Sequence, residues 1–261
     1  MVRHFQRYVA IGDSSTEGLD DPDGHGGYRG WANRLAELIA ARQGALLYAN
    51  LAVRGRSTQR IREEQLEPAV AMQPDLVTVF SGTNDVVAPR FDADALARDM
   101  EAMQRTMVGL GATVLTFTLP DLTPVLPLAR PIAPRIHALN AALRSVSAST
   151  GAILVDVAAY PVASDPRLWS EDRLHANATG HARIAAALAH ALDIPGADDE
   201  WKQPLPPAAF RTRREKVAAE LRWGRDFFLP WVWRHLRGRS SGDGREPKRP
   251  GLEPVQLIRT R

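Results

Sequence analysis

Short apolar runs and segments with a helical hydrophobic period alternate along the first 190 or so residues. Five apolar runs predict buried strands, at residues 8–11, 46–51, 76–80, 113–118 and 153–155. Five segments with apolar residues three and four positions apart predict helices, at residues 31–43, 58–67, 92–108, 132–149 and 178–192. Strands separated by helices form a parallel sheet that helices cover on both faces. We therefore predict an α/β protein with a central five-stranded parallel sheet.

The pattern changes near residue 194. We assign residues 1–196 to one domain, and the prolines within residues 197–207 indicate a linker. Residues 208–238 are basic and aromatic and are predicted to be partly helical, with an interruption at Pro230. Residues 239–261 lack an apolar period, so we expect an extended or disordered tail.

The net charge of +3 is unevenly distributed. Residues 1–200 carry 18 basic and 24 acidic side chains, a net −6, whereas residues 201–261 carry 15 and 6, a net +9. Within the second stretch, Val217, Leu221 and Phe228 fall near one helical face. We expect this helix to pack back on the domain. The alternative is a basic surface for anionic lipid or an acidic partner. No nucleic-acid-binding signature accompanies the arginines, so we expect no nucleic acid.

The chain contains no cysteine, which excludes disulfides, a thiol nucleophile and thiolate metal sites. No apolar run reaches the ~20 residues that a membrane-spanning helix needs. The chain begins without an apolar stretch of signal-peptide length, so we expect a cytoplasmic protein. The histidines show no His-x-x-x-His spacing, and we expect neither a metal nor a cofactor.

The first candidate for chemistry is Ser14, in the sequence GDSSTEG of residues 12–18, directly after the first predicted strand. A serine at this turn has its hydroxyl at the carboxyl edge of the sheet, where parallel sheets bind ligands. Backbone N–H groups at a helix start favour negative charge, which suits a nucleophile whose product is an oxyanion. Taken alone, the segment is better explained as a helix N-cap.

Three further segments change that interpretation, because each lies at a strand end or just before a helix. They contain Gly55, Asn84 and the pair Asp172 and His175. With Ser14 they supply a hydroxyl nucleophile, an imidazole base, a carboxylate to orient the base and neutral donors for an oxyanion. Acyl transfer requires these groups.

The four segments resemble the sequence blocks of the SGNH (GDSL-type) hydrolase family of serine esterases and lipases. They occur in the order of that family: GDS at residues 12–14, Gly55, GTND at residues 82–85 and DRLH at residues 172–175. The resemblance spans about residues 7–192. It implies a three-layer α/β/α sandwich, which agrees with the alternation of strands and helices.

The resemblance also implies a role for each residue. Ser14 would attack the ester carbonyl, His175 would take the serine proton, and Asp172 would hold the useful tautomer of His175. The oxyanion hole would comprise the backbone N–H groups of Ser14 and Gly55 and the side-chain amide of Asn84. Losing one such donor typically raises the barrier by ~2.7–4 kcal/mol.

Two positions depart from the family pattern. Ser15 replaces the usual aliphatic residue and places a second hydroxyl beside Ser14, although the spacing favours Ser14 as the nucleophile. Ala176 stands where proline is common. His181 is an alternative base early in the last predicted helix, and it is better explained as a capping or packing histidine.

Residues 119–134 follow the fourth predicted strand and contain five prolines among leucine and valine residues. They form either a rigid connector or a stiff apolar wall for an acyl group. Loops at the carboxyl ends of strands often determine specificity, so we keep both interpretations.

The sequence thus predicts a serine esterase or lipase-like acyl hydrolase that acts on a small-molecule or lipid-like ester through an acyl-serine intermediate. One alternative is an interaction or membrane-surface protein in which the basic residues 208–261 carry the function. The other is an acyltransferase that uses the same catalytic groups. The sequence specifies neither the acyl chain nor the alcohol.

Overall fold

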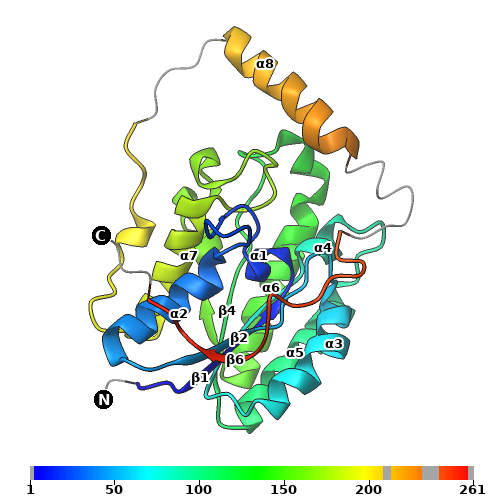
Figure 1. Cartoon of the computed structure of the whole chain (residues 1–261). Helices are drawn as coiled ribbons and strands as arrows, with labels where there is room; N and C mark the ends of the chain where they lie inside the picture. The colour runs from blue at the N-terminus through cyan, green and yellow to red at the C-terminus, as the bar shows by residue number, and fades with distance from the viewer. Residues whose placement is uncertain (1–2, 208–212, 231–240, 258–261) are drawn as a thin grey trace.

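A six-stranded sheet crosses the middle of the protein in a computed structural model that describes residues 3–207, 213–230 and 241–257 (Figure 1). Five of its strands are those predicted: β1 (Arg7–Gly12), β2 (Leu47–Asn50), β3 (Leu76–Phe80), β4 (Thr113–Phe117) and β5 (Ile153–Val155). They are parallel, in the order β5-β4-β3-β1-β2. The predicted parallel α/β architecture is confirmed.

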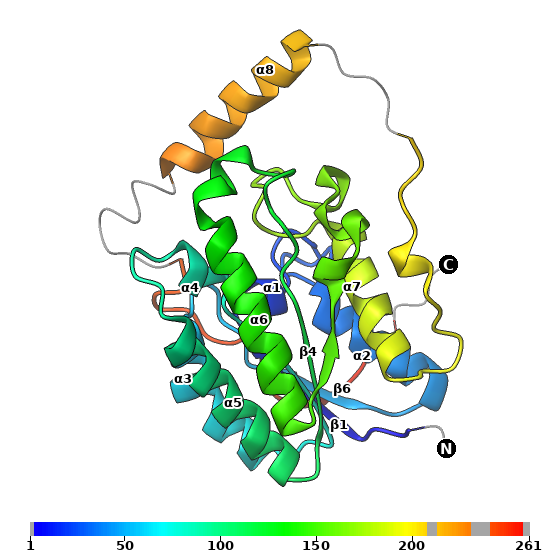
Figure 2. The same ribbon diagram turned by 180° about the vertical axis from the view of Figure 1, so that it is seen from behind.

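Helices cover both faces of the sheet and form the outer layers of a three-layer sandwich (Figures 1 and 2). On one face, α2 (Gly30–Gln43) packs against α7 (Ala178–Ala191). On the other face, α5 (Ala93–Gly109) lies between α3 (Thr58–Ala71) and α6 (Ala133–Thr150).

Burial on both faces explains why continuous apolar runs form strands here. Every residue of β3 is buried, and so are the last five residues of β1. A sheet with one solvated face would require alternating polar positions instead. Side chains cap the helices that connect the strands: Ser57, Asp92 and Asn177 accept hydrogen bonds from first-turn N–H groups of α3, α5 and α7.

The prediction of five strands is wrong by one. The sixth strand, β6 (Arg249–Pro254), runs antiparallel to β2 at the edge of the sheet. Its sequence RPGLEP contains two prolines and a glycine, so no strand pattern is visible in it. Proline is tolerated on an edge strand, which has no second neighbour to bond. β6 covers the backbone groups that β2 would otherwise expose.

Short helices occupy the connections near the carboxyl ends of the strands. Two are α-helical, α1 (Ser14–Glu17) after β1 and α4 (Thr83–Val87) after β3. The others are 3₁₀ turns: η1 (Pro127–Ile132), η2 (Val157–Ala159), η3 (Pro161–Ser164), η4 (Pro166–Leu168) and η5 (Glu200–Lys202).

The basic aromatic region contains α8 (Arg213–Trp223), which continues into one π-helical turn, η6 (Gly224–Phe228). In both ribbon views, α8 lies at the far end of the molecule from β6 (Figures 1 and 2). Residues 208–212 and 231–238 of the predicted helical region lie outside the described residues. Within the described helices, none is both long and apolar enough to cross a membrane.

Two glycines let α1 and α2 approach closely. Gly18 ends α1 with a φ of +98°, and Gly30 begins α2 with a φ of +69°. A Cβ on Gly30 would overlap the Cα of Gly18. Because α1 begins with Ser14, this backbone contact helps to position the turn after β1.

Replacing Gly30 by alanine is expected to lower the free energy of unfolding by about 2–5 kcal/mol. A left-handed φ costs an L-residue ~1–2 kcal/mol, and the overlap with Gly18 adds ~1–3 kcal/mol. Gly111→Ala is the matched control, because Gly111 has a φ of +83° and nothing within 4 Å of an added Cβ. Chemical denaturation measures the free energy of unfolding of both variants. An equal decrease in Gly30→Ala and Gly111→Ala would contradict a tight crossing of α1 and α2.

Candidate active site

The residues singled out in the sequence come together at the carboxyl end of the sheet. Ser14 begins α1 directly after β1, and Asn84 lies in α4 directly after β3. Gly55 lies between β2 and α3. Asp172 and His175 lie on the loop that precedes α7.

One imidazole links a hydroxyl at the sheet edge to a carboxylate on this loop. Nε2 of His175 lies 2.8 Å from Oγ of Ser14, and Nδ1 lies 2.6 Å from Oδ2 of Asp172. When Nδ1 donates to the carboxylate, Nε2 is left to accept from the serine hydroxyl. A base that is oriented in this way and lies within hydrogen-bond distance can remove the serine proton.

Asp172 also shapes the loop. Its Oδ1 accepts hydrogen bonds from the backbone N–H groups of Leu174, at 2.9 Å, and His175, at 3.0 Å. Burial alone would raise the pKa of Asp172, but the hydrogen bonds and charge of His175, with a further bond from Ser170, lower it to about 2. The carboxylate is therefore ionised at neutral pH.

The pKa of His175 is raised above its ordinary value. Burial acts to lower it, but the hydrogen bond and charge of Asp172 outweigh burial, and the charges of Asp20 and Asp13 act in the same direction. Oδ2 of Asp20 lies 3.8 Å from Nδ1 of His175. The hydroxyl of Ser170 lies 2.6 Å from a carboxylate oxygen of both Asp20 and Asp172. Three carboxyl groups thus favour the imidazolium form.

Asp13 caps α1 and holds Asn84. Its Oδ1 accepts from the N–H of Ser15 at 3.1 Å, and its Oδ2 accepts from Nδ2 of Asn84 at 3.1 Å. Burial raises the pKa of Asp13 to about 7, although these hydrogen bonds oppose the shift. Nδ2 of Asn84 also donates to the carbonyl of Arg56 at 3.1 Å. The amide group therefore faces the loop after β2.

Glu17 holds that loop against α1. Its carboxylate accepts a hydrogen bond from the backbone N–H of Arg54 at 2.8 Å and pairs with the Arg54 guanidinium. The next residue, Gly55, has a φ of +74°, a left-handed conformation that glycine adopts without steric strain. The turn at Gly55 is thus tied to the helix that begins with Ser14.

His181, the alternative base, is fully buried and has protein partners on both ring nitrogens. Nδ1 accepts from the N–H of Trp31 at 3.1 Å, and Nε2 donates to the carbonyl of Leu19 at 2.8 Å. Burial lowers the pKa of His181 to about 4. It is a neutral packing histidine, as the sequence indicated.

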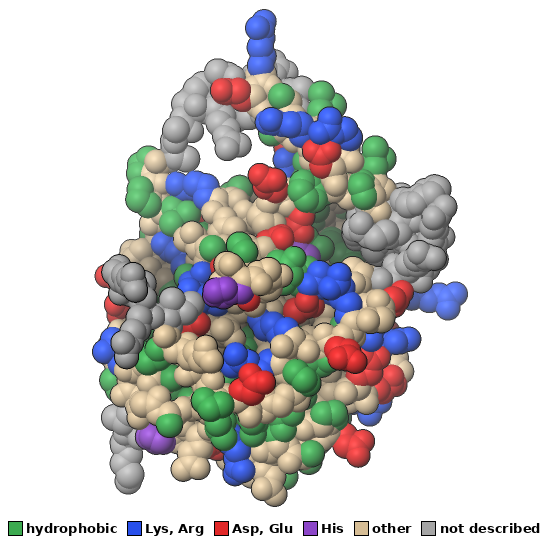
Figure 3. Space-filling model, viewed as in Figure 1, with side chains coloured by type: hydrophobic (Ala, Val, Ile, Leu, Met, Phe, Trp, Pro, Cys, Tyr) green, Lys and Arg blue, Asp and Glu red, His purple; other side chains and the backbone are tan. Residues whose placement is uncertain are grey.

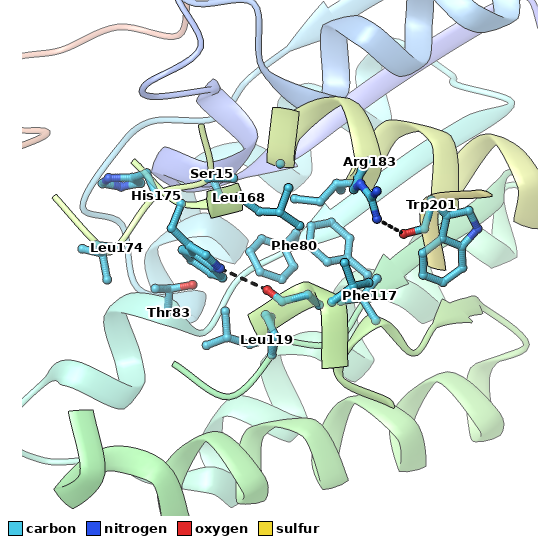
Figure 4. Close-up of a pocket in the computed structure, with 18 of the residues that line it drawn as sticks. Ser15, Phe80, Thr83, Phe117, Leu119, Leu168, Leu174, His175, Arg183 and Trp201 are labelled. Atoms are coloured by element: carbon cyan, nitrogen blue, oxygen red, sulfur yellow. Dashed lines mark hydrogen bonds between the residues drawn. The ribbon is translucent and has the colours of Figure 1, made fainter. Parts of the chain in front are cut away.

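A largely apolar pocket opens beside Ser14 and His175. It encloses about 780 Å³, including the solvent at its mouth. In Figure 4, His175 lies at one end of the lining residues, and Arg183 and Trp201 lie at the other. The walls between the two ends are apolar, with Phe80, Phe117, Leu119 and Leu168 among them. This shape can accommodate an apolar group attached to an ester carbonyl at Ser14.

The chain matches the sequence profile of the GDSL-like lipase/acylhydrolase family over residues 10–183, which is more than half of its length. The chain belongs to this family. The matched region runs from β1 into α7 and contains Ser14, Gly55, Asn84, Asp172 and His175. This acylhydrolase is thus an ester-hydrolysing enzyme by family.

Solved structures of esterases share the fold of this acylhydrolase. Axe2, an acetylxylan esterase from Geobacillus stearothermophilus, is 18% identical with a TM-score of 0.62, covering 78% of this chain and 99% of its own. The lipase/acylhydrolase from Enterococcus faecalis is 21% identical with a TM-score of 0.60, covering 78% and 100%. The psychrotrophic esterase EstA from Pseudoalteromonas sp. is 16% identical with a TM-score of 0.58, covering 72% and 97%. No curated protein sequence matches the chain.

Much of the pocket wall of the acylhydrolase comes from segments without a clear sequence signal. Of residues 119–134, the lining includes Leu119 and Pro120. Five further lining residues come from residues 157–169, which form the turns η2 to η4, and one, Trp201, comes from the predicted linker. The density of apolar residues just before the DRLH block is a signal that could have marked residues 157–169 as part of the pocket.

Among the described residues, one group of acidic and imidazole side chains brings three potential metal-ligand atoms within 4.8 Å: Asp20, Asp172 and His175. Asp172 and His175 bond to each other, and Asp20 bonds to Ser170. All three side chains therefore have hydrogen-bond partners within the protein, and their arrangement around His175 is suited to proton transfer.

The imidazole of His175 is expected to titrate above 6.5, its ordinary pKa. Asp20→Asn should lower that pKa, because it removes a charge that favours imidazolium yet keeps an acceptor for Ser170. NMR titration of the imidazole protons measures both values, with the resonance assigned by its loss in His175→Ala. Asp23→Asn, on the same loop, is the control and should leave the titration unchanged. If the pKa of His175 in Asp20→Asn equals that of wild type, Asp20 does not stabilise the imidazolium form.

Proposed function

We propose that the protein is a serine esterase that cleaves carboxylic esters through an acyl-serine intermediate, with Ser14, His175 and Asp172 as its catalytic triad. The observation that carries the proposal is the 2.8 Å distance between Oγ of Ser14 and Nε2 of His175. The GDSL-like acylhydrolase family of the chain supports the same reaction class. Axe2 was solved as catalytic mutants in which a serine or a histidine is replaced by alanine, which agrees with these roles.

In the first half of the reaction, Oγ of Ser14 attacks the ester carbonyl carbon while Nε2 of His175 takes the hydroxyl proton. The ionised Asp172 stabilises the resulting imidazolium. His175 then gives the proton to the leaving alcohol as the ester C–O bond breaks, which leaves the acyl group on Ser14. In the second half, His175 deprotonates a water molecule, which attacks the acyl carbon. The bond between that carbon and Oγ of Ser14 then breaks, His175 returns the proton to Oγ, and the acid is released.

The tetrahedral oxyanion is stabilised by the backbone N–H groups of Ser14 and Gly55 and by the side-chain amide of Asn84. Ser14 opens α1, and first-turn N–H groups have no carbonyl partner within their helix. Nδ2 of Asn84 donates to Asp13 and to the carbonyl of Arg56, so its bond to the oxyanion replaces one of these two bonds while the other keeps the amide in place.

The substrate is an ester with an apolar acyl chain. The walls of the pocket beside Ser14 are mostly aromatic and aliphatic, with Phe80, Phe117 and Leu168 among them. The structural neighbours include acetylxylan esterases and a lipase/acylhydrolase. Burying each additional CH₂ group contributes ~0.8 kcal/mol, which favours chains longer than acetyl in this pocket.

Ser14→Ala is expected to reduce kcat for p-nitrophenyl butyrate at least about a thousandfold, because the acyl-serine bond no longer forms. Ser15→Ala is the matched control: the Ser15 hydroxyl accepts from Nε1 of Trp31 at 3.3 Å, whereas it is the Ser14 hydroxyl that donates to His175. Its kcat should stay within about threefold of wild type. Undiminished activity in Ser14→Ala would rule out the nucleophile. The same assay with added alcohol separates hydrolysis from acyl transfer, since transfer yields a new ester.

A series of p-nitrophenyl esters from acetate to octanoate should show kcat/KM rising by up to about fourfold per added CH₂ until the pocket is full. Val162→Trp, which fills the wall formed by η3, should move the optimum to shorter chains. Leu126→Ala is the control, because Leu126 packs outside the lining and should leave the chain-length preference unchanged. A flat response in the wild type would contradict an acyl pocket.

A further inference from the structure

The C-terminal extension, defined here as residues 197–261, lies beyond the family match, which ends at residue 183. The structural matches include 97–100% of the residues of the solved esterases but 71–78% of the residues of this chain. The part of the extension that the structure describes nevertheless returns to the site at several points, and Trp201 already lines the pocket.

Trp223, at the end of α8, attaches the extension to the loop before α7. Its Nε1 donates a hydrogen bond to the backbone carbonyl of Asp172 at 3.1 Å. Trp223 is 9% exposed, although its neighbour Leu221 is 72% exposed. The indole ring stacks with Phe228 at a centroid distance of 5.6 Å. The buried indole thus bonds to the residue whose carboxylate orients His175.

Arg173 makes a second attachment between the same loop and α8. Its guanidinium donates to both carboxylate oxygens of Glu220, at 2.7 and 2.9 Å, and lies 4.9 Å from the centre of the Trp223 ring. Arg173 has a φ of +62°, which is unfavourable for a residue with a Cβ. Glycine would adopt this backbone conformation more easily. The arginine side chain provides what glycine cannot, namely the contacts with Glu220 and Trp223 of α8.

A third contact reaches the other side of the site. Gly242 packs against the backbone of Arg54, the residue before Gly55, and a Cβ at position 242 would overlap the Arg54 carbonyl oxygen. Glu17 holds Arg54 from the side of α1. The turn at Gly55 therefore lies between the helix that starts with Ser14 and the extension.

The segment that carries Gly242 is itself fixed to the body. Nζ of Lys248 donates to the carbonyls of Tyr28 and Arg29, at 2.8 and 2.9 Å. Directly after it, β6 pairs with β2. Figure 1 shows this segment running from the region of α4 along the molecule to β6.

We infer that the extension is a structural part of the active site: Trp223 and Glu220 position the loop of Asp172 and His175, and Gly242 positions the oxyanion turn at Gly55. The inference rests on the proposed function, because it assigns these residues to the two halves of that site. Trp223 and Gly242 are positioning residues, since they act through Asp172 and Arg54. Small displacements of catalytic groups strongly reduce rate.

The competing interpretation is that the extension is a separate binding module. Basic and hydrophobic side chains lie side by side on α8 (Figure 3), and Leu221 and Leu229 are 72% and 61% exposed. In that case, changing the contacts of Trp223 or Gly242 would leave the chemistry unchanged.

Trp223→Phe in the full-length protein tests the contact with Asp172, because it keeps an aromatic ring for Arg173 and removes the N–H donor. We expect kcat for p-nitrophenyl butyrate to fall about three- to tenfold with KM changed less than twofold. The pKa of His175 should also fall, because a displaced Asp172 favours imidazolium less. Leu221→Ala is the matched control on the same helix, with wild-type kcat and titration expected.

Gly242→Ala tests the contact with Arg54. We expect kcat to fall at every pH while the His175 titration stays as in wild type, because the oxyanion turn moves and the imidazole does not. Gly251→Ala is the matched control, since nothing lies within 4 Å of a Cβ there. Thermal midpoints of all four variants show whether the body remains folded.

The outcomes separate the inference from the function on which it rests. Wild-type kcat and wild-type His175 titration in both Trp223→Phe and Gly242→Ala would overturn the inference and favour a separate module. A wild-type protein without esterase activity would instead overturn the proposed function. The NMR titration of Trp223→Phe would still show, without any substrate, whether the extension positions His175.

Discussion

The hydrogen bonds of the Asp172 carboxylate hold the site together. One oxygen bonds the imidazole of His175, and the other bonds the backbone N–H groups of Leu174 and His175. A single partly buried charge therefore sets both the path of the loop and the orientation of the ring. A carboxylate taken out of water is stable only with such partners. The conformation of the loop and the orientation of the imidazole therefore depend on the same carboxylate, Asp172.

Two histidines near the start of α7 show how strongly local partners determine the role of an imidazole. The pKa of His175 is raised because Asp172, Asp20 and Asp13 stabilise its charge against the effect of burial. The pKa of His181 is lowered to about 4, since burial dominates and its nitrogens bond neutral backbone groups. Both lie near the start of α7, yet only His175 can accept and return a proton near neutral pH.

The features that follow from a regular pattern could be predicted from the sequence. The strands of the parallel sheet are apolar runs buried on both faces, and Ser14, Asn84 and His175 lie in short blocks at element ends. β6 and the pocket wall around Val162 could not be predicted, because proline-rich and glycine-rich segments have no period. Such segments are ordered by distant contacts, such as those of Lys248 with Tyr28 and Arg29, and those contacts exist only in the folded chain.

One basic residue of the extension, Lys248, has acidic neighbours within the molecule. A basic extension on an acidic domain indicates an anionic partner when the two are considered separately. In the folded protein, the acidic groups that act on Lys248 are Glu17, Asp21 and Asp23 of the domain, and burial lowers the pKa of Lys248 to about 8. The same region of the domain carries Glu17, which holds the turn at Gly55. These carboxylates therefore attract the extension at Lys248, on the side of the domain where Glu17 holds the backbone beside Gly55.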